Sequence, residues 1–149
     1  MIERRLLTAA VVGTLEGHTG KPVGLANAPL DGGWEGEPNV NGSNFVPYTV
    51  VTPNTATMAS GPQSDPQGDR QVPYSLASFG VLPEQAEWMA DTARAAVEQL
   101  KKTTVTLGDR DYKIQQVRTD VIGGLVRVDS TDPPYWGQVD VVTLWLTPA

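Results

Sequence analysis

Hydrophobic positions recur at helical spacing in two stretches of the chain. In residues 2–16 they form one stripe at i, i+4, i+5, i+8, i+9 and i+13, made of Ile2, Leu6, Leu7, Ala10, Val11 and Leu15. Residues 83–102 begin with a proline, which suits the first position of a helix, and carry a second stripe of Ala86, Met89, Ala90, Ala93, Val97 and Leu100. The small alanine side chains predict that this second helix packs closely against a sheet.

Other stretches are rich in β-branched and aromatic residues and predict strands at 45–52, 71–81, 105–107, 112–119, 125–128 and 138–147. Pro47 and Pro73 place the first two strands at a sheet edge or a bulge, because proline cannot donate to a ladder. The last strand is apolar on both faces, which predicts a central position in the sheet. Residues 17–44 and 53–68 are rich in glycine and proline and predict long loops.

This order of elements predicts an α+β fold: a mixed, mostly antiparallel β-sheet packed against two helices, with long Gly/Pro-rich loops. A length of 149 residues predicts a single domain, 1–149. No stretch approaches the roughly 20 apolar residues that a membrane span requires, and the N-terminal apolar run fits a helix better than a signal peptide. We therefore expect a chain made in the cytoplasm, without a membrane partner.

The composition argues against most catalytic chemistry. The chain has no cysteine and one histidine, His18, which excludes thiolate nucleophiles and disfavours zinc sites. Residues 17–21 (GHTGK) lack the first glycine and the hydroxyl of a phosphate-binding loop. The paired carboxylates fall in predicted turns, where aspartate is common: Asp109 and Asp111, and Asp129 and Asp132. We expect no catalytic residue, cofactor or metal, and a role in binding or assembly.

Three aromatic residues are candidates for a protein interface: Trp34, Tyr135 and Trp136. Trp34 lies in the first glycine-rich loop, where it either folds the loop back onto the core or anchors a subunit contact, since tryptophan is enriched at hot spots. Tyr135 and Trp136 follow two prolines that stiffen the backbone. They either cover the end of the sheet or form a preorganised interface element, which loses little entropy on binding.

Four features together resemble the tail terminator proteins of long-tailed bacteriophages, the minor tail protein U-like family. They are a first helix carrying Arg4-Arg5, the strand FVPYTVV at 45–51, the helix at 83–102, and DPPYW at 132–136 before a final apolar strand. The resemblance covers the whole chain in element order. The family has no invariant catalytic motif, and its minimal pattern has a shorter loop than residues 17–44.

The resemblance implies a non-enzymatic virion protein that forms a hexameric ring on the head-proximal end of the tail tube. Such a ring ends tube polymerisation, receives the head-side connector, and lets double-stranded DNA pass through its lumen. The implied partners are other copies of the chain, the major tail tube protein and the head–tail connector. The implied location is the virion tail, after assembly in the host cytoplasm.

The net charge of the chain is compatible with an assembly protein, and two alternatives remain open. A ring needs two different complementary patches on each subunit. Six subunits at −6 each would carry −36, and an acidic lumen would let DNA slide without adhering. A head-closure or other neck protein would share this size and composition. A small hydrolase or ligand-binding domain is the more remote alternative.

Overall fold

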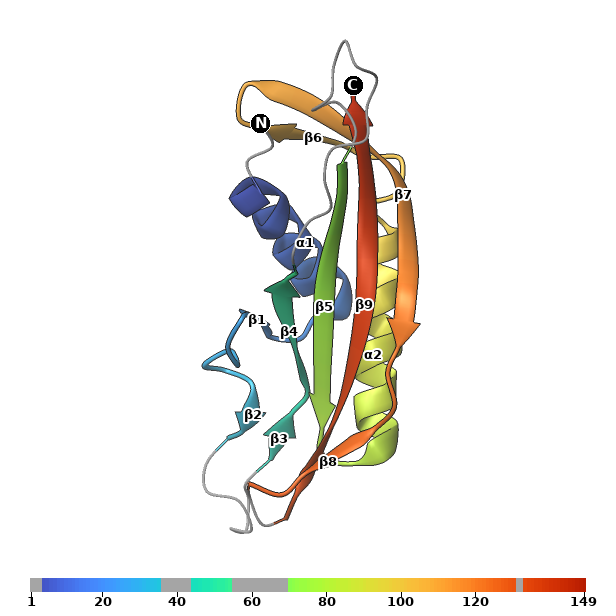
Figure 1. Ribbon diagram of the computed structural model, residues 1–149. Helices are drawn as coiled ribbons and strands as arrows, with labels where there is room; N and C mark the ends of the chain where they lie inside the picture. The colour runs from blue at the N-terminus through green and yellow to red at the C-terminus, as the bar shows by residue number, and fades with distance from the viewer. Residues whose placement is uncertain (1–3, 36–43, 55–69, 131–132) are drawn as a thin grey trace.

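The computed structural model describes residues 4–35, 44–54, 70–130 and 133–149 (Figure 1). Its helices are α1 (Arg4–Thr19) and α2 (Pro83–Glu98). Its strands are β1 (Val23–Leu25), β2 (Gly33–Trp34), β3 (Phe45–Val46), β4 (Tyr48–Pro53), β5 (Arg70–Gly80), β6 (Thr104–Leu107), β7 (Arg110–Ile122), β8 (Val126–Val128) and β9 (Tyr135–Pro148).

In the described part of the chain, seven strands form one long sheet in the order β1-β4-β5-β9-β7-β6, with β8 paired to one end of β9. β1 runs parallel to β4, and every other pair in this sheet is antiparallel. β2 and β3 form a separate two-stranded ribbon. Figure 1 shows these short strands and β8 at the end of the sheet opposite β6. The α+β prediction of a mixed, mostly antiparallel sheet with two helices is confirmed.

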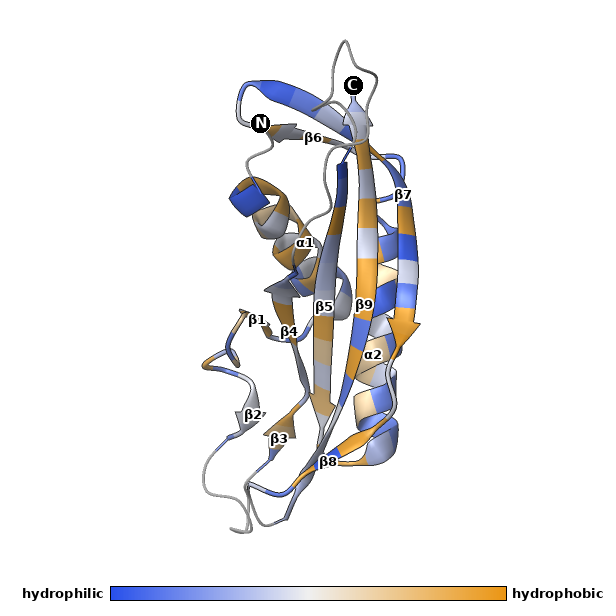
Figure 2. Ribbon diagram, in the orientation of Figure 1, coloured by the Kyte–Doolittle hydropathy of each residue, from blue (hydrophilic) through white to orange (hydrophobic). Residues whose placement is uncertain are grey.

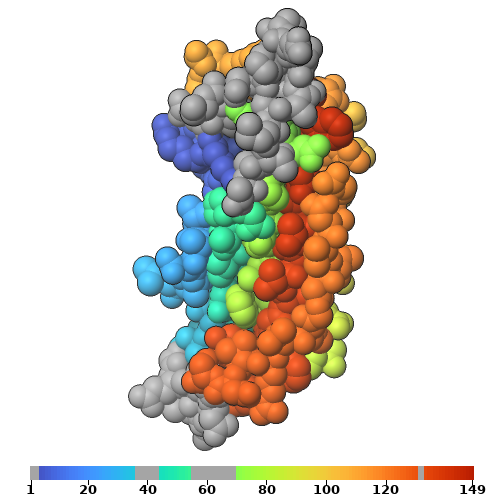
Figure 3. All heavy atoms as spheres, viewed as in Figure 1, coloured from blue at the N-terminus to red at the C-terminus, as the bar shows by residue number. Residues whose placement is uncertain are grey.

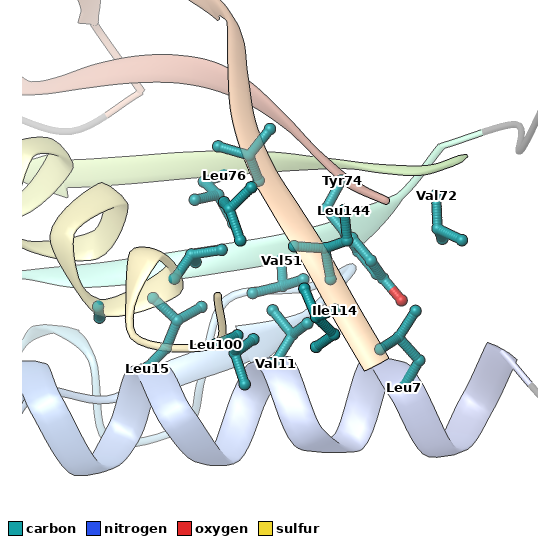
Figure 4. Packing of buried hydrophobic residues seen from close by; sticks show 14 of the residues in the cluster. Leu7, Val11, Leu15, Val51, Val72, Tyr74, Leu76, Leu100, Ile114 and Leu144 are labelled. Atoms are coloured by element: carbon teal, nitrogen blue, oxygen red, sulfur yellow. The ribbon is translucent and has the colours of Figure 1, made fainter. Parts of the chain in front are cut away.

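Both helices cover the same face of the sheet and share one hydrophobic core with it. Leu7, Val11 and Leu15 of α1 have no exposed surface and point toward the sheet, as Figure 4 shows. The α2 stripe packs against β5, α1 and β9, and its small alanines allow the close approach to the sheet that the sequence predicts. The sheet contributes alternating residues to this core, among them Tyr74, Leu76, Val142, Leu144 and Leu146.

β9 is central, as the apolar pattern of its two faces predicts. It pairs with β5 on one side and with β7 and β8 on the other. Hydrophobic residues recur along β4, β5 and β9 in Figure 2. The opposite face of the sheet carries no helix, and Figure 3 shows side chains of β5, β9 and β7 reaching the surface there. β9 also begins three residues earlier than predicted, so it includes Tyr135 and Trp136.

Pro47 and Pro73 are predicted to mark an edge strand or a bulge. The edge alternative is wrong for both, and the ladders of β5 keep a continuous register at Pro73, so there is no bulge there either. Pro47 separates β3 from β4, and β4 is paired on both sides at Thr49–Val51. Pro73 lies in β5, an interior strand, just past the last β4 pair. There its carbonyl accepts from the Asn54 N–H at 3.1 Å, while its missing N–H falls where β4 ends.

The remaining differences concern element ends and the first predicted loop. The helix at 83–102 ends at Glu98, because the chain turns toward β6 with Lys102 in the left-handed region (φ 68°) and its N–H bonded to the Ile114 carbonyl. The stretch predicted as an unstructured loop contains β1 and β2, which pair with segments far along the chain. The predicted loop at 53–68 lies outside the described residues beyond Asn54.

Candidate functional site

Five aromatic side chains gather on the helix-free face of the sheet, near its β2–β3 end. We call them the aromatic cluster; its members are Trp34, Phe45, Tyr48, Phe79 and Tyr135. Trp34 meets Phe45 edge-on with ring centroids 5.4 Å apart, and Tyr48 stacks on Phe79 at 4.9 Å. Tyr135 joins the group through Phe45 at 5.7 Å and Phe79 at 5.9 Å. Residues from opposite ends of the sequence thus form one apolar surface.

The backbone makes room for this cluster at Gly137. A side chain there would place its Cβ 2.7 Å from the Phe79 ring, which is closer than atoms in contact allow. Gly137 pairs with Phe79 across the β5–β9 ladder, so glycine at this position lets the ring lie flat over β9. The need for glycine at position 137 cannot be predicted from the sequence alone, because it depends on the register between β5 and β9.

The cluster is a packing surface and not an acid–base site. Burial, followed by the proximity of Tyr135, raises the pKa of Tyr48 to about 12, so its hydroxyl stays protonated at physiological pH. Trp34 and Tyr135 are half-buried, and Trp34 folds its segment back onto the sheet. A role of their exposed edges in a subunit interface stays a prediction.

Trp136 does not belong to the aromatic cluster. It pairs with Gly80 of β5 and Arg127 of β8, and it is half-buried. Because neighbouring residues of a strand point to opposite faces, Trp136 faces away from Tyr135. The sequence predicts that Tyr135 and Trp136 act together in one stiff element. In the structure they lie on opposite faces of β9. A role of Trp136 at an interface stays a prediction.

A buried ion pair links α2 to the sheet. Asp140 of β9 has no exposed surface, and its Oδ2 lies 3.1 Å from the Nε of Arg94, whose side chain is 20% exposed. Asp140 Oδ1 accepts from the Gly123 N–H at 3.0 Å and from Gln138 Nε2 at 3.1 Å. A carboxylate enclosed in this way has no route to a substrate, so we assign it a structural role.

The other polar residues singled out by the sequence lie in turns or on the surface. His18 is exposed in the last turn of α1. Asp109 lies in the β6–β7 turn beside Gly108, and Asp111 accepts a hydrogen bond from Thr106 at 2.6 Å. Asp129 pairs with Arg127 at 2.7 Å on the surface, and Asp132 lies outside the described residues. Within the described ranges, no three His, Cys, Asp or Glu side chains gather as metal ligands.

Asp120 makes a surface contact that gives a testable pH dependence. The Thr143 hydroxyl donates to its carboxylate, and this bond, with a smaller contribution from Arg118, holds the pKa of Asp120 below its ordinary value of 3.8. A carboxylate with a lowered folded-state pKa stabilises the fold above its unfolded-state value, and this contribution is lost as the pH falls through the folded-state pKa. Asp120→Asn is therefore expected to lose less stability than the native chain on acidification below about pH 4.

The measurement is the urea midpoint between about pH 6 and pH 3 for the native chain and Asp120→Asn. Asp129→Asn is the matched control, because Asp129 is also paired with an arginine but is 72% exposed. An acid dependence of Asp120→Asn as steep as that of the native chain would contradict the assignment.

The sequence interpretation overlooked Trp88, although a signal was present. Trp88 lies outside the apolar stripe of α2, and the structure leaves it 48% exposed. Leu25 of β1 and Leu82 before α2 are also exposed, at 52% and 58%. A large apolar residue on the polar face of an amphipathic helix is a feature that periodicity alone can detect. None of the helices in the described residues is long and apolar enough to cross a membrane.

The described residues define an α+β protein with one long sheet, two helices on one face, and exposed apolar side chains in place of a reactive cluster. The chain is similar in structure to a chain of the virion of a native gene transfer agent particle. The match has a TM-score of 0.57 and 18% sequence identity, and it covers 99% of this chain and 98% of the other. The two chains share the fold over essentially their full lengths.

A second solved structure matches with 11% identity and a TM-score of 0.49, over 98% of this chain and 92% of that one, and supports no further conclusion. No family model and no curated protein matches the sequence. The resemblance to tail terminators therefore remains a prediction.

Proposed function

We propose that the chain is a non-enzymatic structural protein of a phage-like virion and acts there as a tail terminator. The observation that carries this proposal is the fold shared with a virion chain from end to end, 99% of one chain and 98% of the other. Coverage in both directions means that the matching chain consists of this fold alone. The resemblance in Arg4-Arg5, the 45–51 strand, the 83–102 helix and DPPYW at 132–136 points to the same class of protein.

In this proposal, copies of the chain form a ring, six by analogy with the family, on the head-proximal end of the tail tube. The ring blocks further addition of tube protein and presents its other face to the head–tail connector, and double-stranded DNA passes through its lumen. The partners are therefore the chain itself, the tube protein and the connector. The surfaces available for them are exposed apolar and charged side chains on both helices and on the helix-free face of the sheet.

Particles assembled without this chain test the proposal. If the chain ends tube polymerisation, tails made in its absence are expected to grow beyond the normal length and to remain unjoined to heads. Electron microscopy of tail lengths measures this, and expression of the chain in trans is the control that restores normal tails. Tails of normal length that fail to join heads would assign the chain to the neck, as a head-closure or head–tail joining protein. Normal, DNA-filled particles would contradict a structural role altogether.

A further inference from the structure

A groove of about 600 Å³ runs along the outer side of α1, where the helix approaches β1 and the end of β4. We call it the α1 groove; the residues that line it include Arg4, Arg5, Ala9, Gly13, Glu16 and Leu25. Ala9 and Gly13, which have almost no side chain, leave the space over α1 open, and a Cβ added at Gly13 would meet no atom within 4 Å. Leu25, which is 52% exposed, forms one apolar wall.

Two arginines give one end of the groove a positive charge. Arg4 donates from its guanidinium to the backbone carbonyls of Asn54 and Pro73, so its charge is held in place beside the groove. Arg5 is exposed next to it. Glu16 lines the groove about three turns further along the helix, so its carboxylate lies at the far end from Arg4 and Arg5. This surface suits an apolar side chain that carries carboxylates beside it.

The outward surface of α2 has that chemistry. We call it the α2 face; its members are Glu84, Glu87, Trp88, Asp91 and Glu98, all exposed and spaced along one side of the helix. Trp88 is the large apolar residue among these four carboxylates. Arg94, the basic residue of α2, contacts Asp91 and the buried Asp140, so it does not neutralise the rest of the face. Trp88 still exposes 48% of its surface, and tryptophan is enriched among the residues that carry most of the binding energy at interfaces, so Trp88 suits the role of an anchor.

The arginine end of the groove and the α2 face are opposite in charge, and the two surfaces have no residue in common. The volume of the groove is sufficient for an indole, and Arg4 and Arg5 at one end are opposite in charge to Glu84 and Glu87, which flank Trp88. A contact between two different patches of identical subunits is heterologous, so each subunit keeps one free groove and one free α2 face for the next. Such contacts repeat head to tail and produce a ring when the rotation closes.

We propose that a second copy of this chain seats Trp88 and its flanking carboxylates in the α1 groove. This inference deepens the proposed function and relies on it for the identity of the partner. It assigns the subunit contact to the two helices, and it leaves the helix-free face of the sheet for other proteins of the particle.

Two variants test the contact from its two sides. Trp88→Ala removes the anchor, and Gly13→Leu fills the groove. Leucine is favoured over glycine inside a helix by about 0.5–1 kcal/mol, so Gly13→Leu is not expected to fail through misfolding. Native mass spectrometry over a concentration series should show the native chain as an oligomer of the 16.0 kDa subunit and each variant as a monomer. The dissociation constant is expected to rise at least about 30-fold, as for a hot-spot residue.

Mixing the two variants distinguishes this contact from a general loss of association. Trp88→Ala keeps a working groove and Gly13→Leu keeps a working α2 face, so the mixture should form a one-to-one dimer and stop there. Arg5→Glu and Glu87→Arg should each weaken assembly, and the two changes in one chain should restore it. Leu30→Ala removes another exposed leucine and should assemble like the native chain.

Three results would overturn the inference. They are a native chain that stays monomeric throughout the concentration series, native assembly by either single variant, and a mixture of the two that remains monomeric. None of them bears on tail length, which tests the terminator role separately. Tails of normal length made with Trp88→Ala protein, together with native assembly of that variant, would therefore reject this contact and leave the proposed function intact.

Discussion

Replacement of Arg94 by alanine is expected to destabilise the fold by about 3–5 kcal/mol, because it leaves the Asp140 carboxylate charged, fully buried and without its cation. The remaining donors, the Gly123 N–H and Gln138 Nε2, both bind the other carboxylate oxygen. The free energy of unfolding from urea titration at one fixed protein concentration measures the loss.

A second substitution tests whether the uncompensated charge causes that loss. Asp140→Asn in the Arg94→Ala chain removes the charge and keeps an Oδ1 that accepts from Gly123 and Gln138, so it should recover a large part of the stability. The matched control is Arg118→Ala, which breaks an exposed ion pair with Asp120 and should cost about 0.2–1 kcal/mol. Equal losses for Arg94→Ala and Arg118→Ala would refute the account of the buried pair.

Replacement of Leu144 by alanine is expected to cost about 2–5 kcal/mol, because it opens a cavity in the middle of the core. Leu144 has no exposed surface and lies on the central strand β9, between β5 and β7, facing the helices. Figure 4 shows it among residues of α1 and the sheet, which are held by their own strands and helices and cannot collapse into the space. Urea titration again gives the change.

Val139→Ala is the control on the same strand. Val139 is 49% exposed, and its truncation should change the stability by no more than about 0.5 kcal/mol. A loss for Leu144→Ala as small as the loss for Val139→Ala would mean that the core packs differently from the arrangement described above.

The candidate site was predictable only in part. Trp34 and Tyr135 were identified by residue type and by their glycine- and proline-rich surroundings, but their meeting in the aromatic cluster depends on the pairing of β2 with β3 and of β5 with β9. Their proposed role at an interface stays a prediction. Trp88 was missed, although its position off the apolar stripe of α2 was visible in the sequence.

The two helices, the central position of β9 and the α+β class could be predicted from the sequence alone. Each follows from the local spacing of apolar residues: a stripe at helical period for α1 and α2, and two apolar faces for β9. Which distant segments meet could not be predicted in this way and is seen in the folded chain. In the folded chain β1 pairs with β4, Tyr135 and Trp136 lie on opposite faces of β9, and Asp140 is buried beside Arg94. The α1 groove lies over small helix residues beside Leu25. Local periodicity sets which face of an element is buried, whereas strand register and helix packing set what that face touches.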